Sequence, residues 1–152
     1  MKNLNKIVVA FIASMLLGAC GTTSPTEPDE KYLFPELEQV DRISSYKIDG
    51  WGDIDRQSLF VTVSPSKSYL IILKRPNYDL PYAYGIKFNQ RSSSIYAKFD
   101  SINIIMPSSE LDPIPAYIER IYKLENREQK KMVRARIKGE EYVPPQTDEQ
   151  ES

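Results

Sequence analysis

The sequence predicts an α+β fold: a small antiparallel β-sheet of about five or six strands, able to curl toward a barrel, with one C-terminal helix. Two runs rich in β-branched and aromatic residues, 58–63 and 68–73, are typical of strands. Residues 127–138 contain neither Gly nor Pro and carry a narrow apolar stripe, which is typical of a helix. Asn126 with Gln129 three residues later matches a capping box and indicates where that helix begins.

The first strands are expected to form a hairpin. Residues 46–51 alternate weakly between polar and apolar side chains and predict a strand. The runs 58–63 and 68–73 are separated by Ser64-Pro65-Ser66-Lys67, whose residues favour a reverse turn. We therefore expect these two runs to pair with each other.

The later strands are less regular. Residues 83–88 and 94–100 predict short strands, and the apolar positions change face near Asp100, which predicts a β-bulge. Residues 116–124 follow a proline-containing loop, and their apolar spacing fits neither a strand nor a helix cleanly. We interpret this last segment as a strand.

The N-terminus resembles the export signal of a bacterial lipoprotein. Lys2 and Lys6 precede an apolar run over residues 7–17, and this run is too short to span a membrane comfortably. Leu17, Gly18, Ala19 and Cys20 resemble a lipobox, in which the cysteine is acylated and becomes the new N-terminus after cleavage. We predict a signal peptide over residues 1–19 and a lipid anchor at Cys20; an ordinary signal peptide with a stray cysteine is the alternative.

Glycine, not aspartate, follows the predicted anchor at position 21. By resemblance to lipoprotein sorting in Gram-negative bacteria, this residue favours the outer membrane, with the domain facing the periplasm. One acyl chain holds a protein only marginally at a bilayer, whereas two or three hold it stably. The membrane is therefore the first predicted partner.

Charge and composition divide the rest of the chain into three parts. Residues 20–39 carry five acidic side chains and one basic one, and predict a flexible acidic linker. Residues 40–138 contain the predicted strands and helix and form the expected α+β domain. Residues 139–152 carry five acidic side chains and no basic one, and predict a disordered acidic tail.

The composition excludes several classes of function. The 152 residues include no histidine and one cysteine, so histidine-based triads, His/Cys zinc sites and an intramolecular disulfide cannot be built. The 20 basic and 21 acidic side chains nearly balance, which argues against nucleic-acid binding. We expect no cofactor and no metal, and a protein that is not an enzyme.

Two motifs carry weak catalytic or metal-binding alternatives. Ser64 and Lys67 match Ser-x-x-Lys, the acylating motif of penicillin-recognising enzymes, but they stand between two predicted strands and the companion motifs are absent. Asp49, Asp53 and Asp55 surround two glycines, a pattern that offers oxygen ligands to calcium but does not match an EF-hand loop. A hairpin turn and a solvated glycine turn are the favoured interpretations.

A third enzymatic alternative is a pair of carboxylates for glycoside hydrolysis. The sequence offers candidates but cannot pair them: Asp49, Asp53, Asp100 and Glu119.

Two surfaces are candidates for binding. Residues 123–138 carry seven basic and two acidic side chains, so the final helix presents a possible partner or anion surface formed by Arg127, Lys130, Lys131 and Arg134. A solvated helix face is the simpler interpretation. Aromatic side chains are the other candidate, because they can line a pocket for a lipid or a glycan: Trp51, Tyr69 and Tyr96.

Several short motifs occur in one order along residues 46–138: Gly50-Trp51, Ile54–Leu59, Ser64–Ser66, Tyr69–Leu73 with Arg75-Pro76, Ile95-x-Ala97-x-Phe99-Asp100 and Ile118–Leu124. This order resembles the uncharacterised Gram-negative lipoproteins grouped as domain of unknown function 6491. The resemblance implies cysteines in many relatives near the positions of Asn77 and Tyr117, which this chain lacks. It implies no activity and no catalytic residues.

These observations favour one hypothesis over two others. The first is a non-enzymatic outer-membrane lipoprotein whose domain binds an envelope partner, and we expect this partner to be a protein. The second is a small-ligand binding protein that takes a lipid or a glycan. The third is a hydrolase that uses carboxylates or the Ser64–Lys67 pair.

Overall fold

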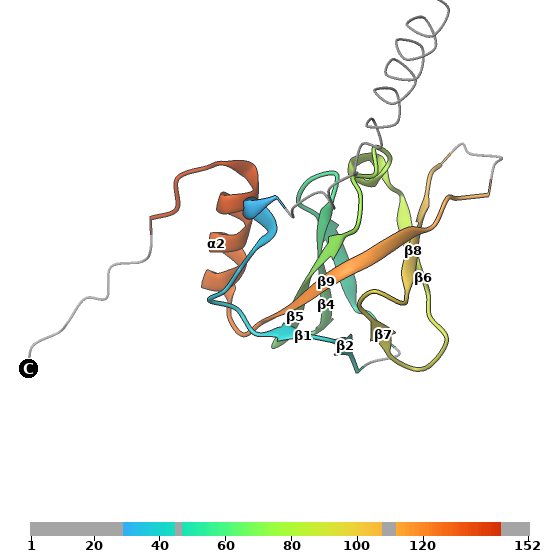
Figure 1. The fold of residues 1–152 in the computed structure, drawn as a ribbon, viewed down its shortest axis with the longest axis horizontal. Coiled ribbons are helices and arrows are strands. Elements are labelled where there is room, and N and C mark those ends of the chain that lie inside the picture. Colours follow the sequence, from blue (N-terminus) through green and yellow to red (C-terminus); the bar gives the residue numbers. More distant parts are fainter. Residues whose placement is uncertain (1–28, 45–46, 108–111, 144–152) are drawn as a thin grey trace, which may run out of the picture.

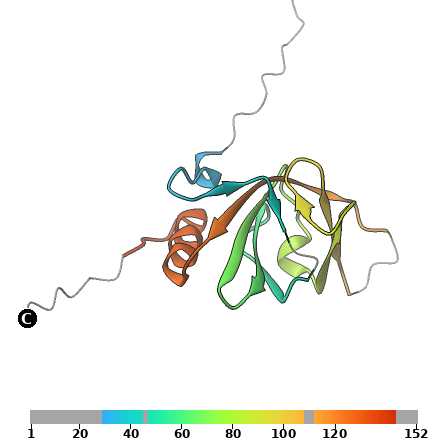
Figure 2. The same ribbon diagram turned by 90° about the horizontal axis from the view of Figure 1, so that it is seen from below.

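A computed structural model describes residues 29–44, 47–107 and 112–143 (Figure 1). These residues form a curled antiparallel sheet, an open half-barrel, with one C-terminal helix lying against it (Figures 1 and 2). The predicted α+β class is therefore confirmed. The predicted signal peptide, the lipobox with Cys20 and the tail beyond residue 143 lie outside the described residues.

The described elements are short, and their bounds are these. The strands are β1 Gln39–Val40, β2 Arg42–Ile43, β3 Gly50–Asp53, β4 Ser58–Ser64, β5 Lys67–Leu73, β6 Gly85–Asn89, β7 Ile95–Tyr96, β8 Ser101–Ile105 and β9 Ala116–Leu124. The helical elements are the 3₁₀ turns η1 Glu30–Tyr32 and η2 Leu80–Tyr82 and the α-helix α2 Arg127–Lys138.

The long strand β9 holds the sheet together. The strand order is β3-β4-β5-β9-β8-β6, and all of these pairs are antiparallel. One edge of β9 pairs with β5, and its other edge is shared: β8 pairs with residues 116–117 and β1 with residues 121–122. Because β9 crosses from one part of the sheet to the other, it sets the curl seen in Figures 1 and 2.

The sheet is buried on both faces, which explains the continuous apolar runs in β4 and β5. The inner face of the curl forms one core: Ile43, Leu59, Val61, Tyr69, Ile71, Leu73, Leu80, Ile95, Ile102, Ile104, Ile118 and Ile121. The other face, which we call the covered face, forms a second core with α2 and the N-terminal segment: Tyr32, Phe34, Leu37, Ile54, Phe60, Leu70, Ile72, Tyr122, Leu124, Val133 and Ile137.

The irregular apolar spacing of residues 116–124 comes from a bulge. Ile72 pairs with Arg120 but Leu73 pairs with Ile118, so Glu119 is the extra residue on β9. The extra residue shifts the side-chain alternation by one position. Ile118 and Ile121 therefore both enter the inner core although they lie three residues apart, and the predicted strand is confirmed.

The predicted strand over 94–100 with a bulge near Asp100 is wrong beyond Tyr96. β7 ends there, and a turn in which Lys98 has a φ of 67° leads into β8. Asp100 is only 3% exposed, and its carbonyl accepts a hydrogen bond from the N–H of Ile118. The alternation therefore changes at a turn between two strands, and Phe99 points outward with 73% exposure.

The predicted linker boundary is also wrong for residues 30–38. Tyr32, Phe34 and Leu37 are buried, and Phe34 is 1% exposed. The ring of Phe34 meets that of Tyr122 edge-on at 5.5 Å between centroids. Because Pro35 and Glu36 interrupt these apolar side chains and further acidic residues surround them, the sequence did not predict that this segment packs on the covered face.

The C-terminal helix matches its prediction. The side chain of Asn126 accepts a hydrogen bond from the N–H of Gln129 at 2.8 Å, and the side chain of Gln129 accepts one from the N–H of Glu125 at 2.8 Å. Gly139 ends the helix with a φ of 69°, and Glu140 donates its N–H to the carbonyl of Ala135. The first residues of the predicted tail thus cap α2.

Candidate functional site

The antiparallel register gathers several loops at one end of the half-barrel. Strands β3, β5 and β8 end there, and β4, β6 and β9 begin there (Figure 1). We call this end the open end, and we define it by residues 54–57, 74–84, 105–107 and 112–117. The hairpin turn between β4 and β5 lies at the opposite end.

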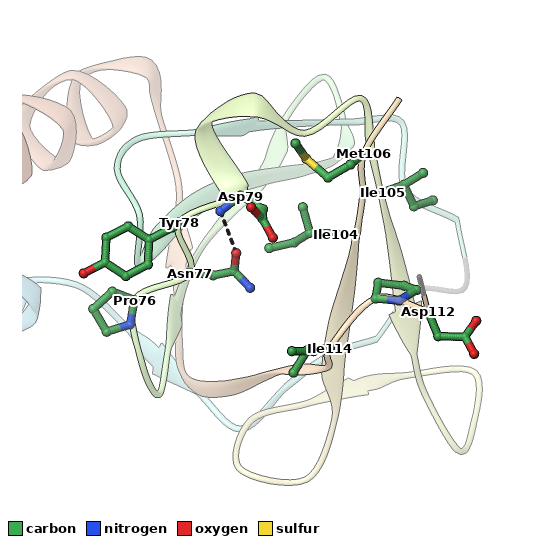
Figure 3. A pocket seen from close by; sticks show the side chains of 10 residues that line it. Pro76, Asn77, Tyr78, Asp79, Ile104, Ile105, Met106, Asp112 and Ile114 are labelled. Carbon is green, nitrogen blue, oxygen red and sulfur yellow. Dashed lines mark hydrogen bonds between the residues drawn. The ribbon is translucent and has the colours of Figure 1, made fainter. Parts of the chain in front are cut away.

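Two adjoining hollows form a groove in the open end. The first measures about 450 Å³ and lies between residues 76–79, the end of β8 and residues 112–114 (Figure 3). The second measures about 490 Å³, shares Pro76, Asn77 and Ile114 with the first, and reaches Lys74 and Tyr117. Each hollow falls within the range of roughly 300–1,000 Å³ that is typical of ligand sites.

Prolines open this groove. The β8–β9 ladder pairs Ile102 with Ala116, and its next rungs would need residues 113–115. Pro113 and Pro115 have no N–H to donate, so the ladder stops and the chain leaves β8. A paired strand would cover one side of this part of the chain. Because no strand pairs there, Ile104 and Met106 form a wall of the groove.

The facing wall is held by Asn77. Its N–H donates to the carbonyl of Arg56 at 2.7 Å, and its side-chain oxygen accepts from the N–H of Asp79 at 2.9 Å. The Asn77 amide nitrogen points into the first hollow, toward Ile114, and the Asp79 carboxylate lies beside Ile104 (Figure 3). The groove therefore combines apolar walls with a hydrogen-bond donor from Asn77 and an acceptor from Asp79.

Exposed apolar and aromatic side chains gather around the groove. In residues 29–44, 47–107 and 112–143, nine large side chains of this kind are exposed, and six of them belong to the open end: Tyr78, Tyr82, Tyr84, Ile105, Ile114 and Tyr117. Ile114 is 83% exposed and Tyr84 is 82% exposed. Exposed apolar side chains concentrated in one region of a small domain make that region a candidate contact surface.

A carboxylate network ties the start of the described chain to the open end. Asp55 accepts hydrogen bonds from Tyr32 Oη and Ser58 Oγ, both at 2.6 Å, from the N–H of Gln57 at 2.9 Å and from Lys31 Nζ at 3.2 Å. Burial alone would raise the pKa of Asp55, but these hydrogen bonds outweigh it and lower the pKa below its usual value. Burial and the bond to Asp55 raise the pKa of Tyr32 to about 12.

The predicted calcium alternative does not assemble. Asp55 is engaged in the network above, Asp49 pairs with Lys47 at 3.6 Å, and Asp53 is exposed. Across the part of the chain that the structure describes, no three His, Cys, Asp or Glu side chains group closely enough to hold a metal ion.

None of the predicted hydrolase residues lines the groove. Ser64 pairs with Lys67 across the hairpin turn, as the turn interpretation predicts, at the end remote from the groove. Three strand spacings, about 14 Å, separate Asp53 on β3 from Glu119 on β9. The buried Asp100 carboxylate accepts a hydrogen bond from the N–H of Tyr96 at 2.7 Å.

The predicted basic surface on α2 is partly used within the fold. Lys130 and Arg134 lie over the ring of Phe60, at 5.0 and 5.6 Å from its centroid. Burial, with the charge of Arg134 added, lowers the pKa of Lys130. Lys131 pairs with Glu128 at 3.0 Å, and Arg127 is exposed. Whether this face binds an anion stays a prediction.

The predicted aromatic pocket is wrong in its residues. Tyr69 is buried in the inner core, Trp51 packs against that core, and the hydroxyl of Tyr96 accepts a hydrogen bond from Arg42 at 3.1 Å. The groove uses Tyr78 and Tyr117 instead. The sequence feature that could have indicated these two tyrosines is that each lies close to two prolines, Tyr78 to Pro76 and Pro81, and Tyr117 to Pro113 and Pro115. Asn77 and Tyr117, near which the family resemblance implies cysteines in relatives, both line the second hollow.

Fold and site together define a small α+β half-barrel with one sealed face and one hollowed end rimmed by tyrosines. The chain belongs to a family of unknown function, DUF6491, which matches residues 3–140, so the family resemblance seen in the sequence is confirmed. Comparisons with curated proteins and with solved structures gave no significant match. Among the described residues, no helix has the length and apolar content needed to span a membrane.

Proposed function

We propose that this protein is a non-enzymatic binding module of the cell envelope, anchored in the outer membrane by lipidated Cys20, whose groove binds an envelope protein in the periplasm. The observation that carries the proposal is the groove itself, with apolar walls, a polar pair and a rim of exposed tyrosines. The lipobox of the sequence supports the anchor and the location.

The chemistry of the groove suits a peptide segment with an apolar side chain. Ile104, Met106 and Ile114 offer an apolar surface, and burying one Leu-sized side chain there contributes roughly 1.5–3 kcal/mol. The Asn77 amide can donate to a peptide carbonyl, and the Asp79 carboxylate can accept from a peptide N–H. Together they would orient an extended segment along the groove.

Site-specific crosslinking in intact envelopes tests the groove. A photoreactive amino acid at position 114 should give one reproducible adduct with a single envelope protein. The same amino acid at Ser66, exposed at the opposite end, is the matched control and should not give that adduct. Identical adduct patterns from the two positions would contradict the proposal.

The anchor has a separate test. Cys20→Ala should release the protein from the membrane fraction or stall its processing, because the acyl chains attach at this side chain. A Cys20→Ala chain that matures normally and stays in the membrane fraction would contradict the lipid anchor.

The size of the groove favours one second candidate, a small apolar ligand such as a lipid acyl chain or a glycan with an apolar face. Mass spectrometry of the intact purified protein under native conditions distinguishes the two. A bound small molecule that is lost in Ile114→Asp supports the ligand. An empty groove together with the position-114 adduct supports the protein partner.

The hydrolase remains the third alternative. Ser64→Ala and Lys67→Ala should leave the cellular phenotype unchanged if the binding proposal is correct. Loss of function in both variants, with the fold intact, would support the Ser-Lys chemistry.

A further inference from the structure

We propose that the open end docks on the lipid bilayer, with Tyr82, Tyr84 and Ile105 in the headgroup region, so that the groove opens at the membrane surface. The proposal rests on the anchor of the proposed function and deepens it, because it states where the binding site works. We call Tyr82, Tyr84 and Ile105 the rim, and in this proposal the lipid bilayer covers the rim.

The tether from Cys20 joins the domain at the open end. Tyr32 and Lys31 bind Asp55, so η1 is held at the open end. The described chain begins at Asp29, nine residues after Cys20. Nine extended residues reach about 30 Å at most. The proposed lipid anchor therefore keeps the open end within about 30 Å of the membrane.

The opposite end is farther from the anchor. The seven-residue strand β4 runs from the open end to the hairpin turn, and a strand of that length spans roughly 23 Å. Because the tether joins the domain near Asp55, the open end lies nearer to the lipid anchor than the hairpin turn does.

The side chains of the rim suit a bilayer surface. A tyrosine has an apolar ring and a polar hydroxyl, and such residues concentrate at membrane–water interfaces. Tyr82 and Tyr84 lie just before β6, and the N–H of Tyr84 donates to the carbonyl of Ile105 at 2.9 Å. The three exposed side chains thus come from neighbouring positions on one rim.

The described charges at this end show no excess of positive charge. The exposed bases Arg56, Lys74 and Arg75 lie there with five exposed carboxylates, while Lys31 and Asp55 pair with each other; the carboxylates are Asp29, Glu30, Asp53, Asp79 and Asp112. Docking through this end would depend on apolar insertion, so it requires neither anionic lipid nor low salt. Docking through the basic face of α2 would require both.

The experiment uses the full lipidated protein reconstituted in phosphatidylcholine vesicles. Because Cys20 is acylated in the proposal, a single introduced cysteine is the only free thiol and takes a fluorescent label. Asp112→Cys places the label at the open end, Ser66→Cys at the hairpin turn and Lys131→Cys on α2; all three positions are exposed. Quenching by nitroxide-labelled lipid then measures the proximity of each label to the bilayer.

The expected result is several-fold stronger quenching at position 112 than at positions 66 and 131, unchanged in high salt. The added pair Tyr82→Ser and Tyr84→Ser should remove most of this difference. Equal quenching at the three positions, or strongest quenching at position 131 in anionic vesicles, would overturn the docking proposal.

Two further outcomes separate this proposal from the function on which it rests. Labelling of the unsubstituted protein would show a free Cys20 thiol and contradict the lipid anchor. A position-112 label that is shielded in native envelopes, but is not quenched by lipid in vesicles, would show that a protein covers the rim. That result overturns bilayer docking and supports the proposed partner.

Discussion

Apolar side chains are buried on the covered face of this protein and exposed at its open end. On the covered face, α2 and the segment of residues 30–38 bury Phe34, Phe60 and Tyr122 almost completely. At the open end, Tyr84 and Ile114 stay in solvent beside a groove of two hollows. Both regions use aromatic and aliphatic residues, so composition alone does not distinguish them.

The difference lies in which side chains the chain itself covers. Arg136 pairs with Glu36 at 2.6 Å, donates to the carbonyl of Leu33 and lies 4.9 Å from the centroid of the Phe34 ring, so helix and N-terminal segment lock together. Prolines keep the strands of the open end apart. One region therefore supports the stability of the fold, and the other leaves its apolar side chains in solvent.

Phe34→Ala tests whether the covered face contributes more to the unfolding free energy than the open end does. A buried phenylalanine typically loses about 3–5 kcal/mol of unfolding free energy when truncated, because transfer and cavity costs add. Urea unfolding of the purified protein measures it. Ile114→Ala at the open end is the control and should change the unfolding free energy by about 0.5 kcal/mol or less. Equal effects would mean that residues 30–38 are not part of the core.

Asp55→Asn tests the network that joins the covered segment to the open end. The amide cannot accept all four hydrogen bonds, and we expect a loss of about 1–3 kcal/mol in unfolding free energy at neutral pH. Asp53→Asn, its exposed neighbour, is the matched control and should be nearly neutral.

The same network predicts a pH dependence. The folded pKa of Asp55 lies below its unfolded value of about 3.9, so its stabilisation is complete above that value and is lost as the pH falls through the folded pKa. Thermal unfolding of the parent protein should lose more stability than Asp55→Asn between neutral pH and about pH 3. Parallel curves for the two proteins would contradict this assignment.

Asn126→Ala tests how firmly α2 seals the covered face. Loss of the N-cap hydrogen bond to Gln129 should cost about 1 kcal/mol. Asn126→Asp keeps the acceptor and should retain most of the stability. A denaturant midpoint that does not move in the alanine variant would show that α2 is held by packing alone.

The smallest effect on stability should come from Ile114→Ser at the open end, because this side chain is 83% exposed. The variant should unfold within about 0.5 kcal/mol of the parent protein, yet capture several-fold less partner when detergent-solubilised envelopes are passed over it. Unchanged capture would remove the groove as the binding surface.

Particular residues show how far the sequence could predict the structure. The Ser64–Lys67 turn and the Asn126 cap depend on residues within four positions of each other, and both were predicted correctly. The turn after β7 is closed by a hydrogen bond from the N–H of Asp100 to the carbonyl of Tyr96. It is joined to β9 by a bond from the N–H of Ile118, far away in the sequence, to the carbonyl of Asp100, and it was mistaken for a bulge. The burial of Phe34 depends on β9 and α2 in the same way.

The groove was missed for a related reason. The tyrosines chosen from the sequence, Tyr69 and Tyr96, lie in strands, whereas Asn77 and Ile114 of the groove come from two separate loops. Its walls exist because β8 and β9 separate at Pro115, and the sequence alone shows the proline but not which strand it leaves unpaired.

The sequence by itself determined the α+β class, the hairpin, the capped helix and the family, because these follow from side-chain periodicity, turn chemistry and short ordered motifs. Only the tertiary structure decided that residues 30–38 belong to the core, that the candidate catalytic residues lie outside the groove and that most of the exposed large apolar side chains lie at one end. These features arise from contacts between segments distant in the chain, and such contacts form only when the sheet curls and β9 brings its neighbours together.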